Sequence, residues 1–121
     1  MRQVRIRATP DGSSYFEEFE LDSSVTEYVP DMPSETTAPD AARSVHLVRM
    51  PAGTVMAWHA SPRPHCAITL SGEVEIAVGD GERRRFGPGE LYFGRDTTGK
   101  GHETRAVGEQ DWVGAVVTLA E

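Results

Sequence analysis

The sequence has little cysteine, few basic residues and no long apolar run, and each shortage excludes a class of protein. Its single cysteine, Cys66, has no partner for an intrachain disulfide. Lysine and arginine number 12 against 19 acidic residues, and the net charge of −7 disfavours nucleic acid and anionic membranes as partners. No apolar stretch approaches the roughly 18 residues that cross a bilayer, and residues 1–10 lack the apolar core of a secretory signal. These shortages predict a cytoplasmic protein.

Glycine and proline are plentiful instead, with 12 and 8 residues that separate short apolar runs. No long apolar stripe of helical period is present, so the pattern favours many short strands joined by turns. The length of 121 residues suits one domain. The expected strands cover residues 2–7, 15–21, 45–50, 54–59, 65–71, 73–78, 83–86, 90–94, 103–107 and 111–119. We therefore predict an all-β barrel of the jelly-roll or Greek-key type.

Residues 22–43 interrupt this pattern because they consist mainly of serine, threonine, proline and acidic residues. Few of them offer enough apolar surface to offset the entropy lost on ordering. We expect a connector that packs on the barrel or on a partner subunit, since long free loops are rare in compact domains. The predicted organisation is an N-terminal part, residues 1–43, followed by the barrel, residues 44–121. Ser14 and Glu17 also match a helical capping box, but the surrounding alternation favours a strand.

Three of the four histidines lie on strands that a small barrel would bring together. Alternation places His59 on one face of strand 54–59 and His65 on one face of strand 65–71. If the turn between them, stiffened by two prolines, folds these strands side by side, the two histidines become cross-strand neighbours. His102 would approach from a later strand. Imidazole is a common ligand of Zn, Fe, Ni and Cu, so the three side chains are a candidate site for a divalent transition metal.

The residues around these histidines resemble the first motif of the cupin superfamily. That motif contains a glycine, two histidines, a glutamate and a second glycine, and Gly53, His59 and Gly72 match its frame without a gap. Ser61 stands where the second histidine belongs, and His65 stands where the glutamate belongs. The resemblance therefore keeps one ligand position as histidine, exchanges another for histidine, and replaces a third with serine.

The resemblance continues through residues 73–76, the Gly79-Asp80-Gly81 turn and residues 86–89, and His102 is similar to the histidine of the second cupin motif. It covers residues 44–121. It implies a double-stranded β-helix barrel, here with an N-terminal strand extension, and it implies a dimer. It also implies a metal held by His59, His65 and His102.

The function that follows is a small metal-dependent enzyme acting on a small anionic organic molecule. A divalent ion held only by neutral imidazoles keeps its full positive charge, which attracts a carboxylate, enolate or thiolate. Arg63, on the turn before His65, is a candidate second anchor. Thr69, on the same strand face as His65, and Asp96, in a loop at the barrel mouth, are further candidates to contact the substrate.

Two alternatives use the same residues without a metal. One is a cupin that binds a small ligand without turning it over. The other is an isomerase, cyclase or lyase in which His65 and His102 act as general acid and base, because imidazole titrates near neutral pH.

Several other histidine, tryptophan, cysteine and arginine residues are expected to have structural roles. His46 and Trp58 are out of phase with the candidate site, and Cys66 alternates out of phase with His65, so we expect these three side chains to serve packing or the surface. The run of Arg83, Arg84 and Arg85 is expected on a solvated strand face.

The sequence of residues 94–101 is similar to the motif of a phosphate-binding loop. The position that would bind Mg²⁺ is Gly101, however, and no amphipathic helix follows, so no nucleotide is expected. We also predict a homodimer, since a barrel of this size leaves sheet edges and apolar faces that need a cover.

Overall fold

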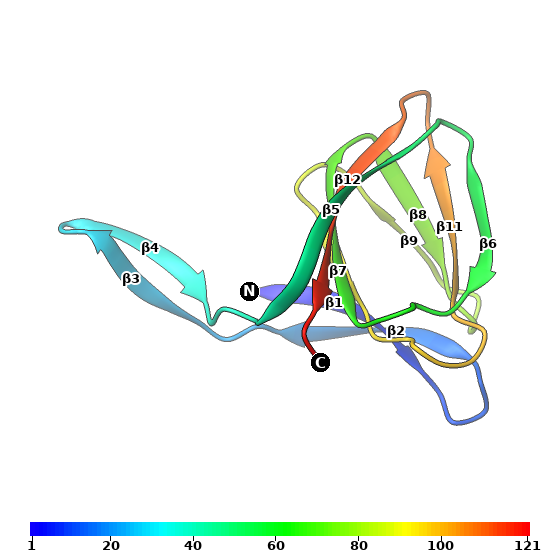
Figure 1. Cartoon of the computed structure of the whole chain (residues 1–121), viewed down its shortest axis with the longest axis horizontal. Helices are drawn as coiled ribbons and strands as arrows, with labels where there is room; N and C mark the ends of the chain where they lie inside the picture. The colour runs from blue at the N-terminus through cyan, green and yellow to red at the C-terminus, as the bar shows by residue number, and fades with distance from the viewer.

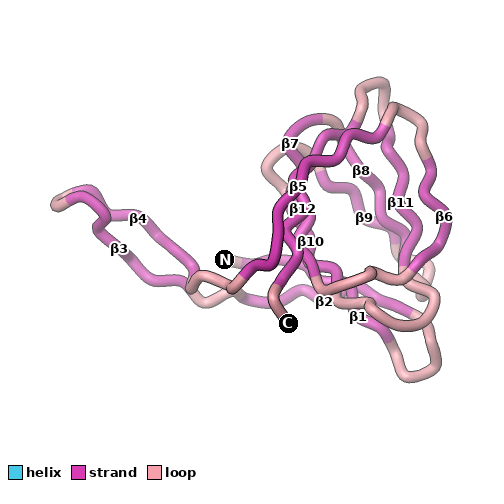
Figure 2. Tube along the Cα trace, in the orientation of Figure 1, coloured by secondary structure: helices cyan, strands magenta, loops and turns pink.

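The structure, a computed structural model, describes residues 1–121 and contains strands but no helix (Figure 1 and Figure 2). The strands, in chain order, are β1 (Arg2–Ala8), β2 (Ser14–Glu20), β3 (Ser23–Val29), β4 (Met32–Thr37), β5 (Ala42–Met50), β6 (Val55–His59), β7 (His65–Ser71), β8 (Glu73–Ala77), β9 (Arg83–Phe86), β10 (Leu91–Gly94), β11 (His102–Val107) and β12 (Trp112–Leu119). The all-β prediction is confirmed, and no helix is present that could span a membrane.

Two sheets face each other and form the barrel (Figure 1). The larger sheet has the order β2-β1-β10-β7-β12-β5, and the smaller has the order β6-β11-β8-β9. Their inward side chains form the main core, whose members include Ile6, Val74, Ile76, Phe86 and Trp112. This is the arrangement that the alternating apolar runs predict, because alternate residues of a strand point to opposite faces. Every strand expected from the sequence is present, although β5 begins at Ala42 instead of residue 45.

The N-terminal strands belong to the barrel itself. Strand β1 pairs in parallel with β10, where Ile6 is opposite Gly94, and pairs with β2 on its other side. Ser14 begins β2 and is almost fully buried. Its hydroxyl donates to the carbonyl of Gly101 (2.6 Å) and accepts from the amide of Gly79 (2.8 Å). Ser14 therefore fixes the strand to two barrel loops, and the helical alternative for this segment is wrong.

Residues 23–37 differ from the predicted connector, because they form a two-stranded hairpin from β3 and β4. The hairpin pairs with no other strand and projects away from the barrel (Figure 1). Its sequence contains Val25, Tyr28 and Val29, which favour extended backbone. Pro30 and Asp31, whose φ is 62°, make the turn. No strands were expected in this connector, because the expectation weighed burial and neglected this local strand preference. Packing of the connector on a partner subunit stays a prediction. We call residues 22–41 the arm.

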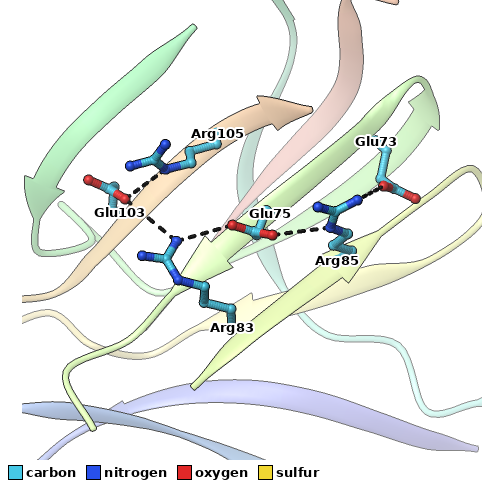
Figure 3. Close-up of polar contacts among 6 residues, drawn as sticks. All are labelled: Glu73, Glu75, Arg83, Arg85, Glu103 and Arg105. Atoms are coloured by element: carbon cyan, nitrogen blue, oxygen red, sulfur yellow. Dashed lines mark hydrogen bonds and ion pairs between the residues drawn. The ribbon is translucent and has the colours of Figure 1, made fainter. Parts of the chain in front are cut away.

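The outer face of the smaller sheet is covered by ion pairs (Figure 3). The carboxylate of Glu75 accepts from Arg83 and from Arg85, at 3.1 Å in each case. The pattern extends to either side through Glu73, Glu103 and Arg105. Arg83 and Arg85 are half exposed or more. This arrangement agrees with the solvated strand face expected for the arginine run.

Candidate functional site

A cavity of about 370 Å³ lies between the two sheets. Its polar lining includes His46, His59, Ser61, Arg63, His65, Tyr92, His102, Thr104 and Thr118. Its apolar lining includes Val48, Met50, Met56, Ala67, Val74, Trp112 and Val116. The volume lies within the range of about 300–1,000 Å³ that is typical of small-molecule sites. The mixture of apolar walls and a few polar groups is also characteristic of such sites.

The three histidines expected at one site do line this one cavity, and they lie on the expected strands, but those strands are not neighbours in the way that the turn between them implied. Strands β6 and β7 are in different sheets, so His59 and His65 are not cross-strand neighbours. The neighbour of His59 is His102 on β11, and their ring centroids are 5.1 Å apart. The prediction of a β6–β7 hairpin was wrong because the turn with its two prolines crosses from one sheet to the other. The histidines still meet because both sheets face the cavity.

Each of these histidines is held in the same way. Nδ1 of His59 donates to the carbonyl of Ala57 (2.8 Å), and Nδ1 of His65 donates to the carbonyl of Arg63 (3.1 Å). Nδ1 of His102 donates to Oδ2 of Asp96 (2.7 Å). Because every acceptor is an oxygen, Nδ1 carries the proton and Nε2 of the neutral ring keeps a lone pair. The Nε2 atoms make no hydrogen bond within the chain and are therefore available to a ligand.

Asp96 and Ser61 form a buried support behind His102. Asp96 is completely buried, and its Oδ1 accepts from the hydroxyl of Ser61 (2.7 Å) while its Oδ2 accepts from His102. The amide of Ser61 donates to the carbonyl of Asp96 (2.9 Å). Both carboxylate oxygens are occupied, and Asp96 does not line the cavity. Asp96 is therefore not placed to make the substrate contact that was expected from the sequence. Asp96 positions His102, and Ser61 positions Asp96.

A bulge in β6 turns His59 toward the cavity together with Met56. The pairing of β11 with β6 shifts between His102 and Thr104, where His102 is opposite His59 and Thr104 is opposite Met56. Two residues on β11 therefore correspond to three on β6. Strict alternation would put Met56 and His59 on opposite faces, but the extra residue places both along the cavity. Alternation predicted that Val55, Ala57 and His59 face the site together. That prediction is wrong for Val55 and Ala57, which do not line the cavity.

Thr69 does not reach the cavity. Its hydroxyl accepts from Nε1 of Trp112 (2.9 Å) and donates to the carbonyl of Phe86 (3.3 Å), and the side chain is buried. Thr69 is therefore not placed to make the substrate contact that was expected from the sequence. Its partner Trp112 lines the cavity instead. Arg63, in contrast, lines the cavity and is exposed, and its guanidinium makes no ion pair within the chain. Arg63 remains a candidate anchor for an anion.

Sequence reasoning missed Tyr92, whose ring lies between two of the histidines. The ring centroid of Tyr92 is 6.0 Å from that of His65 and 6.4 Å from that of His102, edge-on in both cases. The side chain is buried, lines the cavity, and makes no hydrogen bond through its hydroxyl within the chain. Burial raises the pKa of Tyr92 above its ordinary value, so the hydroxyl keeps its proton. Tyr92 owes this place to the β10–β7 register, which sets it opposite the inward residue Ala67 and which no local pattern in the sequence reveals.

Burial also lowers the pKa of His65, against the opposing effect of the hydrogen bond to the Arg63 carbonyl. The positive charge that His102 acquires on protonation lowers the pKa of His65 further, and that of His59 adds to this, while Asp96 acts in the opposite direction. His65 is therefore neutral near neutral pH. Its Nε2 is an acceptor in the cavity.

Two glycines leave the space that the histidines occupy. A Cβ added to Gly94 would meet Cε1 and Nδ1 of His65 and the hydroxyl of Ser61. A Cβ added to Gly101 would meet the carbonyl of His59, and the φ of Gly101 is +74°, in the left-handed region that favours glycine. The loops on both sides of the site are thus built around the absence of a side chain.

The three histidines do not form a complete metal-ligand set in this structure. No group of three histidine, cysteine, aspartate or glutamate side chains is arranged so that it could hold a metal ion. The rings of His59 and His102, with centroids 5.1 Å apart, are close enough for one shared ion at about 2.0–2.1 Å from each nitrogen. Asp96 is turned away and bonded to His102. The residues thus offer suitable donor atoms but lack the third donor that a metal centre requires.

The remaining expectations concern residues outside the site. Cys66 is buried, and burial raises the pKa of its thiol to about 11, which agrees with an inert packed residue. Trp58 is half-buried, and the ammonium of Lys100 lies 4.1 Å from its ring centroid. His46 is exposed, as expected, but it also lines the cavity, because Val45 and Leu47 face outward.

No protein-family model and no curated protein matches the sequence. Solved structures do match. A DMSP lyase from Ruegeria pomeroyi is 28% identical over 70% of this chain with a TM-score of 0.56, and the match spans 41% of the lyase. A cupin superfamily protein from Desulfitobacterium hafniense is 16% identical over 70% of this chain and 73% of its own (TM-score 0.53). A cupin-2 domain protein from Shewanella frigidimarina is 17% identical over 81% of this chain and 79% of its own (TM-score 0.50).

Proposed function

From a chain that has the cupin fold, we propose an enzyme that moves a proton on a small anionic molecule, in the manner of a lyase or isomerase. The proposed base is Nε2 of His102, and the proposed proton donor is the hydroxyl of Tyr92. The observation that carries this proposal is the buried Asp96–His102 hydrogen bond of 2.7 Å behind a cavity of about 370 Å³.

The Asp96–His102 pair has the parts that a general base needs. Asp96 accepts the Nδ1 proton, so the Nε2 lone pair is directed at the cavity in one tautomer. When Nε2 takes a proton, the adjacent carboxylate stabilises the imidazolium that forms. Ser61 holds the other carboxylate oxygen, so Asp96 cannot rotate away from His102. A positioned base of this kind contributes typically 10²–10⁴-fold to a proton-transfer step.

Tyr92 supplies the complementary group. Its hydroxyl keeps its proton because burial raises the pKa of Tyr92, and no group of the chain occupies it. The hydroxyl can donate to the oxygen on which negative charge develops as His102 removes a proton from the neighbouring carbon. In an elimination, the electrons of the broken C–H bond form the double bond and the leaving group departs with its own electron pair.

The substrate class follows from the lining. Arg63 is an unpaired cation at the cavity, suited to a carboxylate. Met50, Met56 and Trp112 offer apolar surface to the body of the molecule. The likeness to a DMSP lyase, at 28% identity, supports an elimination as the reaction to test first. Because the chain spans less than half of that lyase, the lyase's activity is for this chain a proposal only.

Metal binding is a second candidate, favoured by one observation. All three histidines donate from Nδ1 to an oxygen, which is the arrangement that orients imidazole ligands of metals. The ion would be Fe, Ni, Zn or Cu, as imidazole donors suit these metals. It would be shared by His59 and His102, with His65 moving to complete the set.

The test combines turnover with elemental analysis of protein purified without a histidine tag. DMSP and a panel of small carboxylates are incubated with the protein, and their consumption is followed by NMR. We expect turnover that His102→Ala, Asp96→Asn and Tyr92→Phe each reduce, while Arg83→Gln, on the outer face of the smaller sheet and away from the cavity, retains it. Turnover should survive a chelator. About one metal per chain, lost with activity on chelation, would replace the acid–base proposal by the metal one. A homodimer and a cytoplasmic location remain predictions.

A further inference from the structure

The arm has no partner within its own chain. Strands β3 and β4 pair only with each other. Val25, Tyr28, Val29 and Met32 expose 72%, 75%, 53% and 64% of their surface. A two-stranded ribbon is at best marginally stable in water by itself. The arm therefore needs a surface to cover its apolar side chains.

The outer face of the six-stranded sheet carries apolar side chains that are covered in one part and open in another. Cys66, Phe93 and Leu119 form a small cluster there, apart from the main core, and Ile68, Leu91 and Val117 pack against it. Toward the β5 edge this face is open, since Val45, Leu47 and Leu70 are 67%, 71% and 52% exposed. The neighbouring residues His46 and Val48 line the cavity, so alternation fixes Val45 and Leu47 on the outside.

Charge makes the two surfaces complementary. The arm carries Asp22, Glu27, Asp31, Glu35 and Asp40 and contains no lysine or arginine. On β5, Arg49 follows Val45 and Leu47 on the outward side, and the exposed Arg43 precedes them at a bulge in the pairing with β12. Arg49 pairs with Asp111 across 3.5 Å at an exposed position, and Arg43 makes no ion pair within the chain. An acidic apolar ribbon thus matches an apolar strand flanked by arginines.

We infer that the protein is a dimer in which the arm of each chain lies on the outer face of β5 and β7 in the other chain. The arm leaves the larger sheet after β2 and returns to it at β5, and it extends away from its own barrel (Figure 1). A twofold axis lets both arms dock in the same way, so one contact surface is used twice. The occupant of each outer face is the arm of a second copy of this chain. The acid–base site of each barrel remains complete within one chain.

The experiment measures mass by light scattering and sedimentation at tens of micromolar. Wild-type protein should have about twice the chain mass of 13.2 kDa. A double change in the arm, Val25→Ser with Tyr28→Ser, should give a monomer, and so should Leu47→Glu on the docking face. Val55→Ser removes an apolar side chain that is 50% exposed on β6, in the other sheet, and should leave the dimer intact. Far-UV circular dichroism and thermal melting establish that each variant is folded.

Mixing the two monomeric variants separates arm exchange from face-to-face docking. The Leu47→Glu chain keeps a native arm, and the double arm variant keeps a native face, so one native contact forms between them. We expect a heterodimer in the mixture, weaker than the wild-type dimer, and none in either variant alone. A monomeric wild type overturns the inference. It is equally overturned if the arm variants stay dimeric, or if the mixture contains no heterodimer.

Discussion

The cavity and the outer face of the six-stranded sheet are lined by alternate residues of the same strands, yet they depend on different partners. Around the cavity, the polar groups that hold His102 find their partners within one chain, through Asp96 and Ser61. On the outer face, Val45 and Leu47 find no cover in the chain. Under the two proposals, the chemistry belongs to the single barrel and the apolar exterior to a contact with a second chain. Changes inside should therefore alter turnover without altering mass, and changes outside should do the reverse.

The largest expected effect is on turnover, from His102→Ala. Removing the imidazole removes the proposed base and leaves Oδ2 of the buried Asp96 without a hydrogen-bond donor, while Oδ1 still accepts from Ser61. We expect turnover of the responding substrate to fall by about 10²–10⁴-fold, measured by NMR under substrate saturation, with the mass of the protein unchanged. Asp96→Asn should preserve the fold, because it keeps the side chain's size. Its turnover should fall less than that of His102→Ala. Full activity of His102→Ala would show that the base lies elsewhere.

Gly94→Ala tests the space beside His65. The added methyl group would meet the His65 ring and the Ser61 hydroxyl, so the ring must move. We expect a loss of stability of about 1–3 kcal/mol in urea titrations and a loss of turnover. Gly87→Ala is the matched control, since the nearest atom to its Cβ is the flexible carboxylate of Glu90 at 3.6 Å. Equal stability of the two variants would mean that Gly94 is not needed for the site.

Thr69→Val tests the support of the cavity wall. The change keeps the side chain's shape but leaves Nε1 of Trp112 buried without an acceptor. An unsatisfied buried donor costs about 1–3 kcal/mol of folding free energy, which chemical denaturation would measure. On the arm, Thr36→Val removes a hydroxyl that bonds Thr26 at a more open position, and we expect a loss below about 0.5 kcal/mol. A reversed order would contradict this assignment.

The smallest effect is expected on the outer face of the smaller sheet. Arg83→Gln removes ion pairs to Glu75 and Glu103 that lie at a half-exposed position (Figure 3). Exposed pairs contribute about 0.2–1 kcal/mol, so its melting temperature should change little and its mass should not change. Arg43→Gln, an equivalent change on the β5 face, should weaken the dimer in sedimentation dilution series. Equal dimer affinity in both variants would remove the distinction between the two outer faces.

Local patterns predicted the barrel strands because each strand is half buried and alternates. They also brought His59, His65 and His102 to one cavity. The roles of Asp96 and Tyr92 could not be read from the same patterns. They depend on contacts between segments distant in sequence, namely the Asp96–Ser61 hydrogen bond and the β10–β7 register.

The arm was missed for a different physical reason. Its apolar residues are too few to form a core with their own chain, so composition predicted a connector and no strands. Strand preference and the turn at Pro30 nevertheless form a hairpin. The bulge in β6 was missed likewise, because alternation assumes an uninterrupted ladder.

The most direct test of the account is the tautomer of each histidine in the native protein. Long-range ¹H–¹⁵N NMR spectra at about pH 8, where histidines with an unperturbed pKa near 6.5 are neutral, distinguish protonated from unprotonated ring nitrogens. The account predicts a proton on Nδ1 and a free lone pair on Nε2 for His59, His65 and His102, with signals that a chelator leaves unchanged. His46, which has no such acceptor, serves as the internal reference. A proton on Nε2 of His102 would contradict the account, because that nitrogen could then not serve as the base.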